Sequence, residues 1–592
     1  MRLNQIRSVC LAALAGLTAA AVVPAERVQK RATSSIVASS TSSRVADAVC
    51  THGPTTRGCW KNGYSIATDF DQKFPSTGKI VPHSITITNT TCNPDGHGER
   101  LCLLINDQYP GPTLSATWGD TMQVTVKNAM QDNGTSIHWH GVRQYHSPGM
   151  DGVNGITECP LAPGQTKTFT FPVSQYGHSW YHAHYSSQYG DGIVGNLVFD
   201  GPSTANYDED LGPYVINEWY YQTALAVNSI AFQNLQAGGP PPNADNVLIN
   251  GTNKNANGGG SYNKVSVKAG KKYRLRLVNM SVDNYMRVSL DNHVLQIMAS
   301  DFIPVVPFYV ETLLLAIGQR YDVVITTNQT ASNYWFRADA AADCLSGNNF
   351  HGLAIWTYNS VAVATPTTTA YSFTTGCVEP SQVEPYWLQP VPSSSFANDI
   401  GNLPLGLTKA QVAPNGDLTI VWSLDSGSID VDWAKPTIEY LFEGNTSYPA
   451  AFNLLPTMQE GAWNYVVIQQ SQQAPPVPHP FHLHGHDFFV LGQGTGTFSA
   501  STAALNFNNP PRRDTATVIG GGWLAMAFNS NNPGTWLMHC HIAWHVAEGL
   551  GLQFLESPAQ ITLPDRTQFE GQCSAWQSYY QTAYWDKDDS GI

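Results

Sequence analysis

The chain has 592 residues, more than one hydrophobic core normally serves, so several domains are expected. Its formal net charge is -14, from 30 Lys and Arg residues against 44 Asp and Glu residues. Binding to nucleic acid or to an anionic membrane surface needs a basic patch, so this balance argues against both.

The first residues are typical of a secretory signal peptide. Arg2 and Arg7 precede a short apolar run that ends in small residues. That run is too short for a membrane span, and no later stretch reaches the roughly 20 uninterrupted apolar residues that a transmembrane helix needs. The dibasic pair Lys30-Arg31 indicates a propeptide cleavage site. We therefore expect a signal peptide and propeptide over residues 1–31, a mature start near Ala32, and an extracellular protein.

Glycosylation sequons and the cysteine count agree with export. Sequons stand at Asn89, Asn133, Asn250, Asn279, Asn328 and Asn445. Of the 10 cysteines, Cys10 is removed with the signal peptide and Cys540 lies in a histidine motif. The number of cysteines that remain is even. A full set of disulfides is therefore possible in an oxidising compartment, although sequence alone leaves their pairing open.

Short segments of alternating apolar and polar residues recur along the chain. They include residues 84–88, 122–128, 166–173, 273–279 and 321–327. A period of two indicates half-buried strands, and Gly, Pro and Asn clusters separate these segments. The pattern predicts an all-β fold of several sandwiches or barrels.

One histidine pattern occurs twice. HWHG at residues 138–141 is followed by HAH at 182–184, and HLHG at 482–485 is followed by HCH at 539–541. In both places a Trp precedes the second motif and a Gly-rich strand follows it. The repetition predicts two copies of one β-domain, separated by a segment that lacks these motifs.

The paired histidines predict a metal centre. Residues i and i+2 of a strand point to the same face, so each HxH motif presents two imidazoles side by side. The pairs are His138/His140, His182/His184, His482/His484 and His539/His541. Their eight imidazoles exceed the roughly four to six ligands of a single first-row ion, so we expect more than one metal ion.

Cys540 must point to the face opposite its flanking histidines, toward a different site. Its candidate partners are His545, a few residues later, and His479. One thiolate with two imidazoles is the ligand set of a mononuclear copper electron-transfer site, in which a weak axial ligand tunes the potential. Leu550, ten residues after Cys540, cannot coordinate, which predicts a higher potential than a Met-ligated site has.

The segments HWHG, HAH, HPFHLHGH and HCHIAWHVAEGL together resemble the four copper-binding segments of multicopper oxidases, most closely the secreted laccases of ascomycete fungi. The likeness runs from about Cys50 to the last residue. It implies three cupredoxin-like Greek-key domains, which we place at residues 32–202, 203–378 and 379–592, the third carrying the type 1 copper.

The resemblance also implies a function. The protein would be a laccase, a benzenediol:oxygen oxidoreductase that couples one-electron oxidation of phenols or aromatic amines to four-electron reduction of O2 to water. Four copper ions would carry the chemistry, because O2 needs four electrons and each phenol gives one. We expect a monomer without a nucleic-acid or membrane partner.

Carried over residue by residue, the resemblance assigns the copper ligands. His479, Cys540 and His545 would hold the type 1 copper, with Leu550 as its non-coordinating axial neighbour. His138 and His482 would hold the type 2 copper. The type 3 pair would be held by His140, His182 and His541 on one ion, and by His184, His484 and His539 on the other.

Two carboxylates receive roles from the same resemblance. Asp283 falls where laccases place an acid in the substrate pocket beside the type 1 histidine, here His545, and could accept the phenol proton. Asp151 falls where the family keeps an acid that relays protons to the trinuclear cluster. The alternatives are an ordinary loop aspartate and a turn residue before Gly152.

The cysteines and the final residues match the same family. The resemblance implies the disulfides Cys50–Cys59, Cys344–Cys377 and Cys159–Cys573, which leaves Cys92 and Cys102 to pair with each other. The last four residues, DSGI, resemble the processed end of ascomycete laccases, which is tucked into the solvent channel. The family more often has Leu where Ile592 stands.

Three alternatives stay open. A metal-ion oxidase would need several acids around the type 1 histidine, and an ascorbate-type oxidase usually has Met where Leu550 stands. A copper electron carrier would need only the Cys540 site, so the eight further histidines argue against it. The sequence does not identify the natural substrate. It also leaves open whether the biological role is lignin degradation, pigment synthesis or detoxification.

Overall fold

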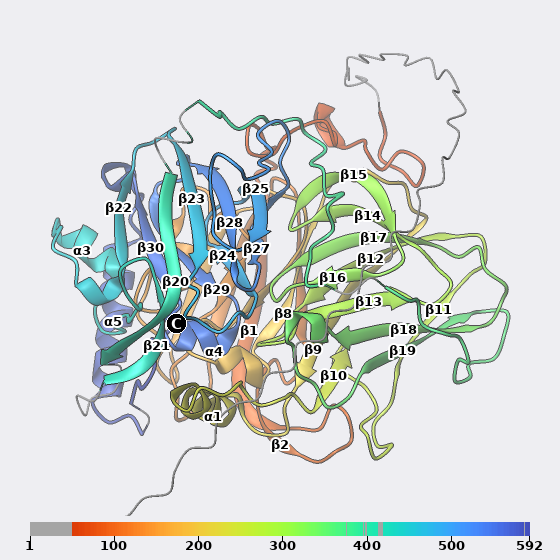
Figure 1. The fold of residues 1–592 in the computed structure, drawn as a ribbon, viewed down its shortest axis with the longest axis horizontal. Coiled ribbons are helices and arrows are strands. Elements are labelled where there is room, and N and C mark those ends of the chain that lie inside the picture. The colour runs from red at the N-terminus through yellow and green to blue at the C-terminus, as the bar shows by residue number, and fades with distance from the viewer. Residues whose placement is uncertain (1–49, 374–375, 395, 397–399, 412–417, 585) are drawn as a thin grey trace, which may run out of the picture. The chain divides into compact units, whose positions relative to one another are not determined.

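The computed structural model describes residues 50–373, 376–394, 396, 400–411, 418–584 and 586–592. The predicted signal peptide, propeptide and mature start at Ala32 lie outside these residues. The described strands form three pairs of sheets that follow one another along the chain (Figure 1).

The first pair of sheets ends at residue 200. Its sheets have the strand orders β2-β1-β4-β6 and β3-β8-β7-β5. The strands are β1 (Ile80–Cys92), β2 (Arg100–Ile105), β3 (Gly111–Thr117), β4 (Thr121–Asn128), β5 (His138–His140), β6 (Thr166–Pro172), β7 (Gly177–His182) and β8 (Val194–Asp200).

The second pair follows, with the orders β10-β9-β12-β17-β14-β15 and β11-β19-β18-β13-β16. The strands are β9 (Glu209–Trp219), β10 (Asn246–Ile249), β11 (Asn263–Val267), β12 (Lys272–Asn279), β13 (Met286–Leu290), β14 (Leu295–Ser300), β15 (Ile303–Val310), β16 (Leu313–Leu315), β17 (Arg320–Thr326), β18 (Asn333–Ala340) and β19 (Gly352–Tyr358).

The third pair has the orders β21-β20-β23-β28-β25-β26 and β22-β30-β29-β24-β27. The strands are β20 (Ile400–Gln411), β21 (Leu418–Leu424), β22 (Leu454–Met458), β23 (Trp463–Gln470), β24 (His479–Leu483), β25 (Phe488–Thr495), β26 (Arg512–Arg513), β27 (Thr515–Val518), β28 (Gly522–Asn529), β29 (Gly534–Cys540) and β30 (Gly551–Glu556).

The three pairs share one connection pattern. The first strand of each pair runs parallel to a later strand of its own sheet, as β1 does with β4, β9 with β12 and β20 with β23. In the facing sheets, β3 pairs in parallel with β8, β11 with β19 and β22 with β30. The all-β prediction is confirmed. The histidine pattern revealed only two of the three repeats, because the middle repeat has no HxH motif.

Few helices accompany the sheets. The α-helices are α1 (Ala224–Gln236), α3 (Thr437–Glu443), α4 (Ala543–Ala547) and α5 (Arg566–Tyr580). Short 3-10 turns are η1 (Lys61–Gly63), η2 (Pro148–Met150), η3 (Gln188–Asp191), η4 (Ala342–Cys344), η5 (Ala450–Phe452) and η6 (Pro558–Gln560). The Asp565 side chain caps α5 by accepting a hydrogen bond from the Gln568 N–H at 2.8 Å. Among the described residues, no helix is both long and apolar enough to span a membrane.

The predicted alternation holds for some strands and fails for others. In β4, Met122, Val124 and Val126 are buried and the residues between them are more exposed, as expected of a half-buried strand. In β12 the two arginines are buried as well: Arg274 pairs with Asp322, and Arg276 with Asp210 at 2.8 Å. The central position of β12 buries both of its faces, so its polar face is satisfied by ion pairs instead of water.

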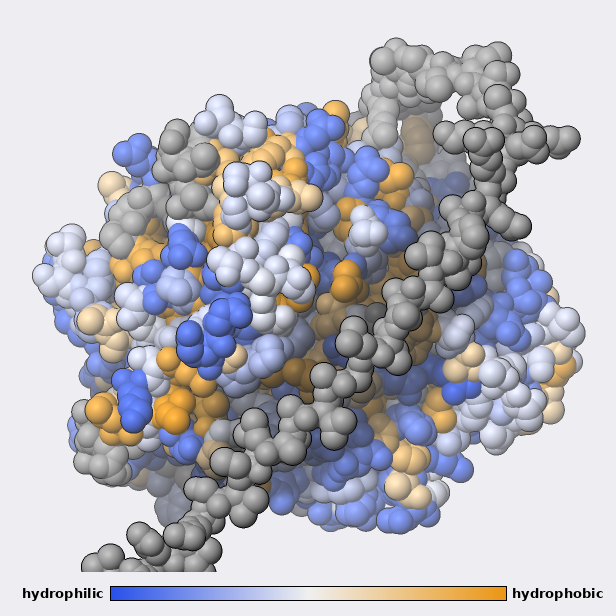
Figure 2. Space-filling view, viewed as in Figure 1, coloured by the Kyte–Doolittle hydropathy of each residue, from blue (hydrophilic) through white to orange (hydrophobic). Residues whose placement is uncertain are grey.

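All four predicted disulfides are present, including the Cys92–Cys102 pair reached by elimination. Cys159–Cys573 joins residues 414 positions apart and ties α5 to the first pair of sheets. Cys540 is the free cysteine of the described residues, and it is buried. On the surface, Figure 2 shows hydrophilic and hydrophobic residues interspersed over the viewed face.

The structure removes Asn279 from the candidate glycosylation sites. Its side chain is fully buried, and its Nδ2 donates to the carbonyls of Asn284 at 2.9 Å and Leu315 at 3.1 Å. A glycan on this nitrogen would replace one of its two hydrogens and so break at least one of these bonds, and it has no room beside the buried strand. Asn328, by contrast, is exposed.

We expect peptide mapping of the folded protein, produced in a eukaryotic secretory host, to find Asn279 unmodified. The exposed Asn328 serves as the internal comparison, because its side chain is accessible in the folded state. A glycan on Asn279 in active, folded protein would show that the loop after β12 is wrongly placed.

Candidate metal centre

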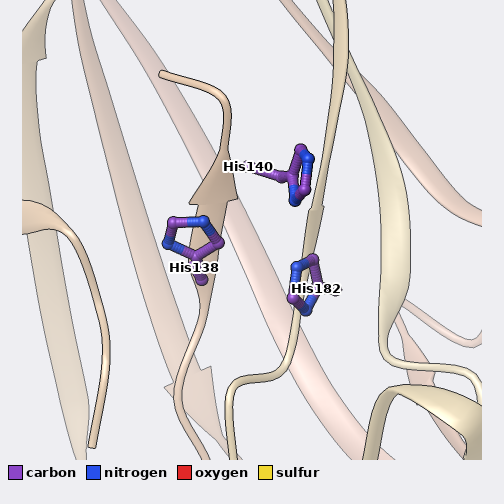
Figure 3. Close-up of side chains that lie close together, drawn as sticks. All are labelled: His138, His140 and His182. Carbon is purple, nitrogen blue, oxygen red and sulfur yellow. The ribbon is translucent and has the colours of Figure 1, made fainter. Parts of the chain in front are cut away.

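The eight histidines of the HxH motifs converge on one buried site. Each is at most 4% exposed. Figure 3 shows His138 and His140, from β5, and His182, from β7, with their rings facing a shared space. The third pair of sheets closes the site, because the His482 ring stacks on His140 at 3.9 Å and the His484 ring lies 4.0 Å from His138.

Strand pairing brings the motifs together. His138 on β5 is opposite His182 on β7, and His482 on β24 is opposite His539 on β29. Only His138 and His140 both lie within a strand. In the other three pairs the second histidine follows the end of its strand, so the shared-face argument is strictly correct for one pair and approximate for the rest.

The hydrogen bonds of the rings fix which nitrogen is free. The Nδ1 atoms of His138 and His482 lie 2.9 and 2.8 Å from the carbonyl oxygens of Asp151 and Asp514. His539 Nδ1 lies 2.8 Å from the Cys540 carbonyl oxygen. A ring that donates from Nδ1 leaves Nε2 as the lone-pair nitrogen, which is the arrangement of a metal-ligating histidine.

Several ring nitrogens of the cluster have no protein partner. In the cluster, the buried ring nitrogens without a hydrogen-bond partner among the described residues are His138 Nε2, His182 Nε2, His184 Nδ1 and Nε2, His482 Nε2 and His541 Nδ1. An orphaned buried polar atom is costly, so this cluster points to a ligand that fills the gap. Neutral imidazole nitrogens suit copper, and the donor set fits the ion that the motifs predict.

The surroundings keep six of these rings neutral. Burial, followed by the neighbouring histidines, lowers the pKa of His539 to about 3. The same causes place the pKa of further cluster histidines well below the ordinary value: His140, His182, His184, His484 and His541. Deprotonated rings are the form that binds a metal cation.

Cys540 faces a separate group on the other side of its strand. Its Sγ lies 3.6 Å from Nδ1 of His479 and 3.6 Å from Nδ1 of His545, and these two nitrogens are 3.1 Å apart. The three donor atoms therefore form a compact triangle. Burial raises the pKa of the Cys540 thiol, so a bound cation is needed to hold it as the thiolate.

Two apolar groups border this triangle. Leu550 is fully buried, and its backbone carbonyl accepts from the Cys540 N–H at 3.1 Å, which holds it beside the cysteine. The Trp422 ring lies 4.9 Å from the His479 ring and 4.6 Å from the His545 ring. Sequence reasoning missed Trp422, which no motif marks.

Asp151 lies at the cluster, where the sequence predicted an acid. Its Oδ2 is 2.8 Å from His484 Nδ1 and its Oδ1 is 3.3 Å from His138 Nδ1. Two histidines outside the four HxH pairs make other contacts: His486 Nδ1 lies 3.2 Å from the His484 carbonyl oxygen, whereas His178 Nε2 lies 3.2 Å from Asn196 Oδ1.

A second acid, Asp514, was missed by sequence reasoning. Its Oδ1 lies 3.3 Å from His140 Nε2 and 3.5 Å from His482 Nδ1. Arg320, at the start of β17, holds this carboxylate through two hydrogen bonds of 2.6 Å. Burial raises the pKa of Asp514, but Arg320 and the bond to His482 outweigh burial and leave the pKa below its ordinary value. The partners are 194 residues apart, so no local pattern reveals the pair.

Asp283 lies in the loop between β12 and β13. The neighbouring Val282 carbonyl accepts from the N–H of Ala543 at 2.7 Å, and Ala543 begins the helix α4 that carries His545. Burial, then the charge of Glu218, raises the pKa of Asp283 to about 8. The loop thus places an acid of high proton affinity next to the Cys540 group.

Glu218, the residue that shapes this loop, was also missed. Its buried carboxylate accepts hydrogen bonds from the N–H groups of Val282, Asp283 and Asn284 at 2.6, 2.8 and 2.9 Å. Three charge-assisted bonds to consecutive backbone groups fix the loop conformation.

The DSGI segment runs into the protein. Asp589 bonds to Ser186, the Ser590 hydroxyl donates to the Val546 carbonyl at 2.6 Å, and Ile592 is 1% exposed. Ile592 and Val546 line a small cavity together with the cluster histidines His182, His184, His539 and His541. The end of the segment therefore lies against the histidine cluster.

The fold and the site together define a class of protein, a copper oxidase with more than one copper centre. The fold contributes three repeated cupredoxin-like pairs of sheets. The site contributes a buried cluster of histidines and, beside it, a triangle of one cysteine and two histidines. Family models described as multicopper oxidase match residues 86–204, 212–360 and 430–560. The chain belongs to the multicopper oxidase family.

Similar proteins narrow the class further. Laccase-3 of Botryotinia fuckeliana is 49% identical over 457 residues, which cover 75% of this chain and 100% of that protein. The laccase of Neurospora crassa is 41% identical, with 91% of this chain and 89% of that protein covered. A crystal structure of the Botrytis aclada laccase, 39% identical, superposes with a TM-score of 0.85 over 92% of this chain and 100% of that one. The predicted enzyme class is confirmed: the chain is a laccase-type oxidase, and its family uses four copper ions.

The Arg320–Asp514 pair supplies a test of the centre. We expect Arg320→Met to lower the free energy of unfolding by about 3–5 kcal/mol, because it leaves Asp514 buried and unpaired. Denaturant unfolding of the metal-free protein measures this loss without the contribution of bound metal. Lys435→Met, which removes an exposed pair with Glu443, is the matched control and should leave unfolding unchanged. If Arg320→Met and Lys435→Met changed the free energy of unfolding equally, the buried ion pair between Arg320 and Asp514 would be contradicted.

Proposed function

We propose that the two centres hold copper through the ligands that the sequence assigned. The type 1 ligands are His479, Cys540 and His545, whose donor atoms lie within 4.8 Å of one another. The type 2 ligands are His138 and His482. The type 3 ligands are His140, His182 and His541 on one ion, and His184, His484 and His539 on the other. The groups His479/Cys540/His545 and His184/His484/His539 are compact enough for one ion each, which supports the assignment.

One observation carries this proposal. Cys540, in the triangle, is joined through the backbone to His539 and His541, which face the histidine cluster. When bound, copper supplies one-electron acceptance at the triangle and O2 reduction at the cluster. The protein places ligands of the two centres on adjacent residues of one strand. Electrons therefore have a short covalent path from the triangle to the cluster.

The substrates we propose are phenols and aromatic amines, with O2 as the oxidant. The relatives' names as laccases support this class. Glu218 holds the loop, and Asp283 accepts the proton that a phenol loses when it gives up an electron. When the phenol loses its proton and its electron together, no charged phenol radical forms. The barrier to phenol oxidation is therefore lower. The buried, apolar Leu550 beside Cys540 favours a high potential.

At the cluster, the acids orient the rings. Asp151 holds His484 and His138, and Asp514 faces His140 and His482. Carboxylates in these places fix the ring tautomers, and we propose that Asp151 also passes protons toward reduced oxygen. Ile592 and Val546 restrict the access of water to the cavity beside the cluster.

We further propose a secreted monomer divided into domains 32–202, 203–378 and 379–592. The ranges of the three family models support the division, since they follow one another along the chain much as the proposed domains do. The disulfides and the sequons support secretion, because both are typical of exported proteins.

The copper proposal predicts a spectrum and a stoichiometry. We expect the purified protein to hold about four coppers, to show an intense blue band at roughly 600 nm and to consume O2 with a methoxyphenol. Cys540→Ser should abolish the blue band and phenol-driven O2 uptake while about three coppers remain, because the cluster ligands are untouched. A blue protein with a single copper and no O2 uptake would instead be an electron carrier.

The proton-acceptor role of Asp283 predicts a pH dependence. The carboxylate form accepts the proton, and the pKa of Asp283 is raised to about 8, so kcat/KM for phenols should rise with pH below that value. Bound copper, a nearby cation, lowers this midpoint. Asp283→Asn should remove the rise and reduce phenol oxidation by about 100-fold or more.

The control donor is ferrocyanide, which gives an electron without a proton and should be oxidised equally by wild type and Asp283→Asn. Glu218→Gln removes the negative charge that helps to raise the pKa of Asp283, so the rise for phenols should move to lower pH. If the pH profile of phenol oxidation were the same in Asp283→Asn as in wild type, the phenol proton would have to go to an acceptor other than Asp283.

A further inference from the structure

A chain of aromatic rings begins beside the histidine cluster. Tyr185 directly follows His184, and its ring stacks on Trp433 with centroids 4.2 Å apart. Trp433 lies 5.7 Å from Trp576, and Trp576 stacks on Tyr580 at 5.2 Å. The first two steps join side chains that are far apart in the sequence, so the chain is a product of the tertiary fold.

The burial of these rings changes along the chain. Tyr185, Trp433 and Trp576 are buried, with Trp576 at 0% exposed. Tyr580 and its neighbour Tyr579, near the end of α5, are half-buried and reach solvent. Trp576 lies 5.6 Å from Tyr579 as well, so the path ends at a pair of surface tyrosines.

A second set of aromatic rings also contacts the cluster but does not reach the surface. Trp180 stacks on His182 at 4.2 Å and lies 6.0 Å from Tyr189. Tyr189 is only 6% exposed, so this pair ends inside the protein. The Tyr185 chain differs because it continues to the surface.

Tyrosine and tryptophan are the aromatic side chains that give up an electron most readily. Because the rate of electron transfer falls steeply with distance, several short steps between stacked rings are faster than one long step. The rings of this chain are also placed to manage protons. Trp433 Nε1 donates to the Gly591 carbonyl at 2.8 Å, and the Tyr580 hydroxyl, which accepts from the Lys587 N–H at 2.8 Å, is close enough to solvent to release its proton to water.

We propose that Tyr185, Trp433, Trp576 and Tyr580 form a path that carries oxidising equivalents from the copper cluster to the surface of α5 when phenol is scarce. The inference rests on the proposed copper ligands and adds a second exit for oxidation, away from the Asp283 loop. It supplies a function for a segment that the laccase reaction itself does not use.

Electrons and protons balance along the path. With copper bound, O2 present and fewer than four electrons supplied, Trp433 would give one electron to the cluster across Tyr185. Trp576 and then Tyr580 would replace that electron. Tyr580 loses its phenolic proton to water and becomes a neutral radical. A phenol in solution returns one hydrogen atom to Tyr580, which restores the chain and yields a phenoxyl radical. The net reaction remains phenol oxidation by O2.

The test uses the copper-loaded enzyme without phenol. The enzyme is reduced with fewer than four electron equivalents of dithionite per molecule, mixed with O2 and frozen within milliseconds for electron paramagnetic resonance. We expect an organic-radical signal besides the cupric lines. A nitroso spin trap added at mixing should give an adduct that mass spectrometry places on Tyr580 or Tyr579.

Two variants and one control separate the path from packing. Trp576→Phe should reduce the radical signal several-fold, and Tyr580→Phe, which keeps the ring, should remove the adduct at position 580. Trp356→Phe makes the same change at a buried tryptophan of β19, away from the chain, and should leave the signal as in wild type. Copper content and steady-state phenol oxidation should be unchanged in all three.

The outcomes distinguish this inference from the proposed function. Wild type that is blue, holds its copper and consumes O2 with phenol, but forms no organic radical, would overturn the path and leave the laccase proposal intact. A radical of equal size in Trp576→Phe would overturn the step through Trp576, because Trp433 also lies 6.2 Å from Tyr580. Loss of copper binding or of O2 uptake in wild type would instead overturn the proposed function, on which the path depends.

Discussion

The alternation of side chains at residues 539–541 is the constraint on which the rest of the site depends. His539 and His541 face the cluster, so Cys540 faces His479 and His545 on the other side of the strand. The distance between the two centres is therefore set by the backbone and not by loops. Pairing of β29 with β24 then brings His482 opposite His539, so one strand pair contributes to both centres.

The burial of so many imidazoles is the second governing feature. Burial removes the hydration of these rings and lowers the pKa of several of them, His140 and His182 included, so the cluster favours a metal cation over protons, and that cation can satisfy the orphaned nitrogens. Ligand binding in such a site is coupled to folding, because the metal-free cluster keeps unsatisfied buried groups. Asp514, held by Arg320, adds the buried negative charge that a cationic centre favours.

Much of the site was predictable because its signals are local. The HxH motifs, the cysteine between two histidines and the non-coordinating Leu550 are read from short spacings, and the structure brings these residues together. Glu218, Trp422, Arg320 and Asp514 were missed because their importance lies in contacts with distant residues. No spacing rule shows that Glu218 accepts three N–H bonds from residues more than sixty positions away.

The sequence by itself determined the chemistry: the ligand types, their order along the chain, the strand alternation that separates two centres and the cysteines available for disulfides. Only the tertiary structure decided which rings meet, that the polar face of β12 is buried in ion pairs, that Asn279 is inaccessible to a glycan and that Tyr185 leads to the surface of α5. The reason is physical. Residue type and alternation act over a few residues, whereas burial and proximity depend on which sheets pack against each other.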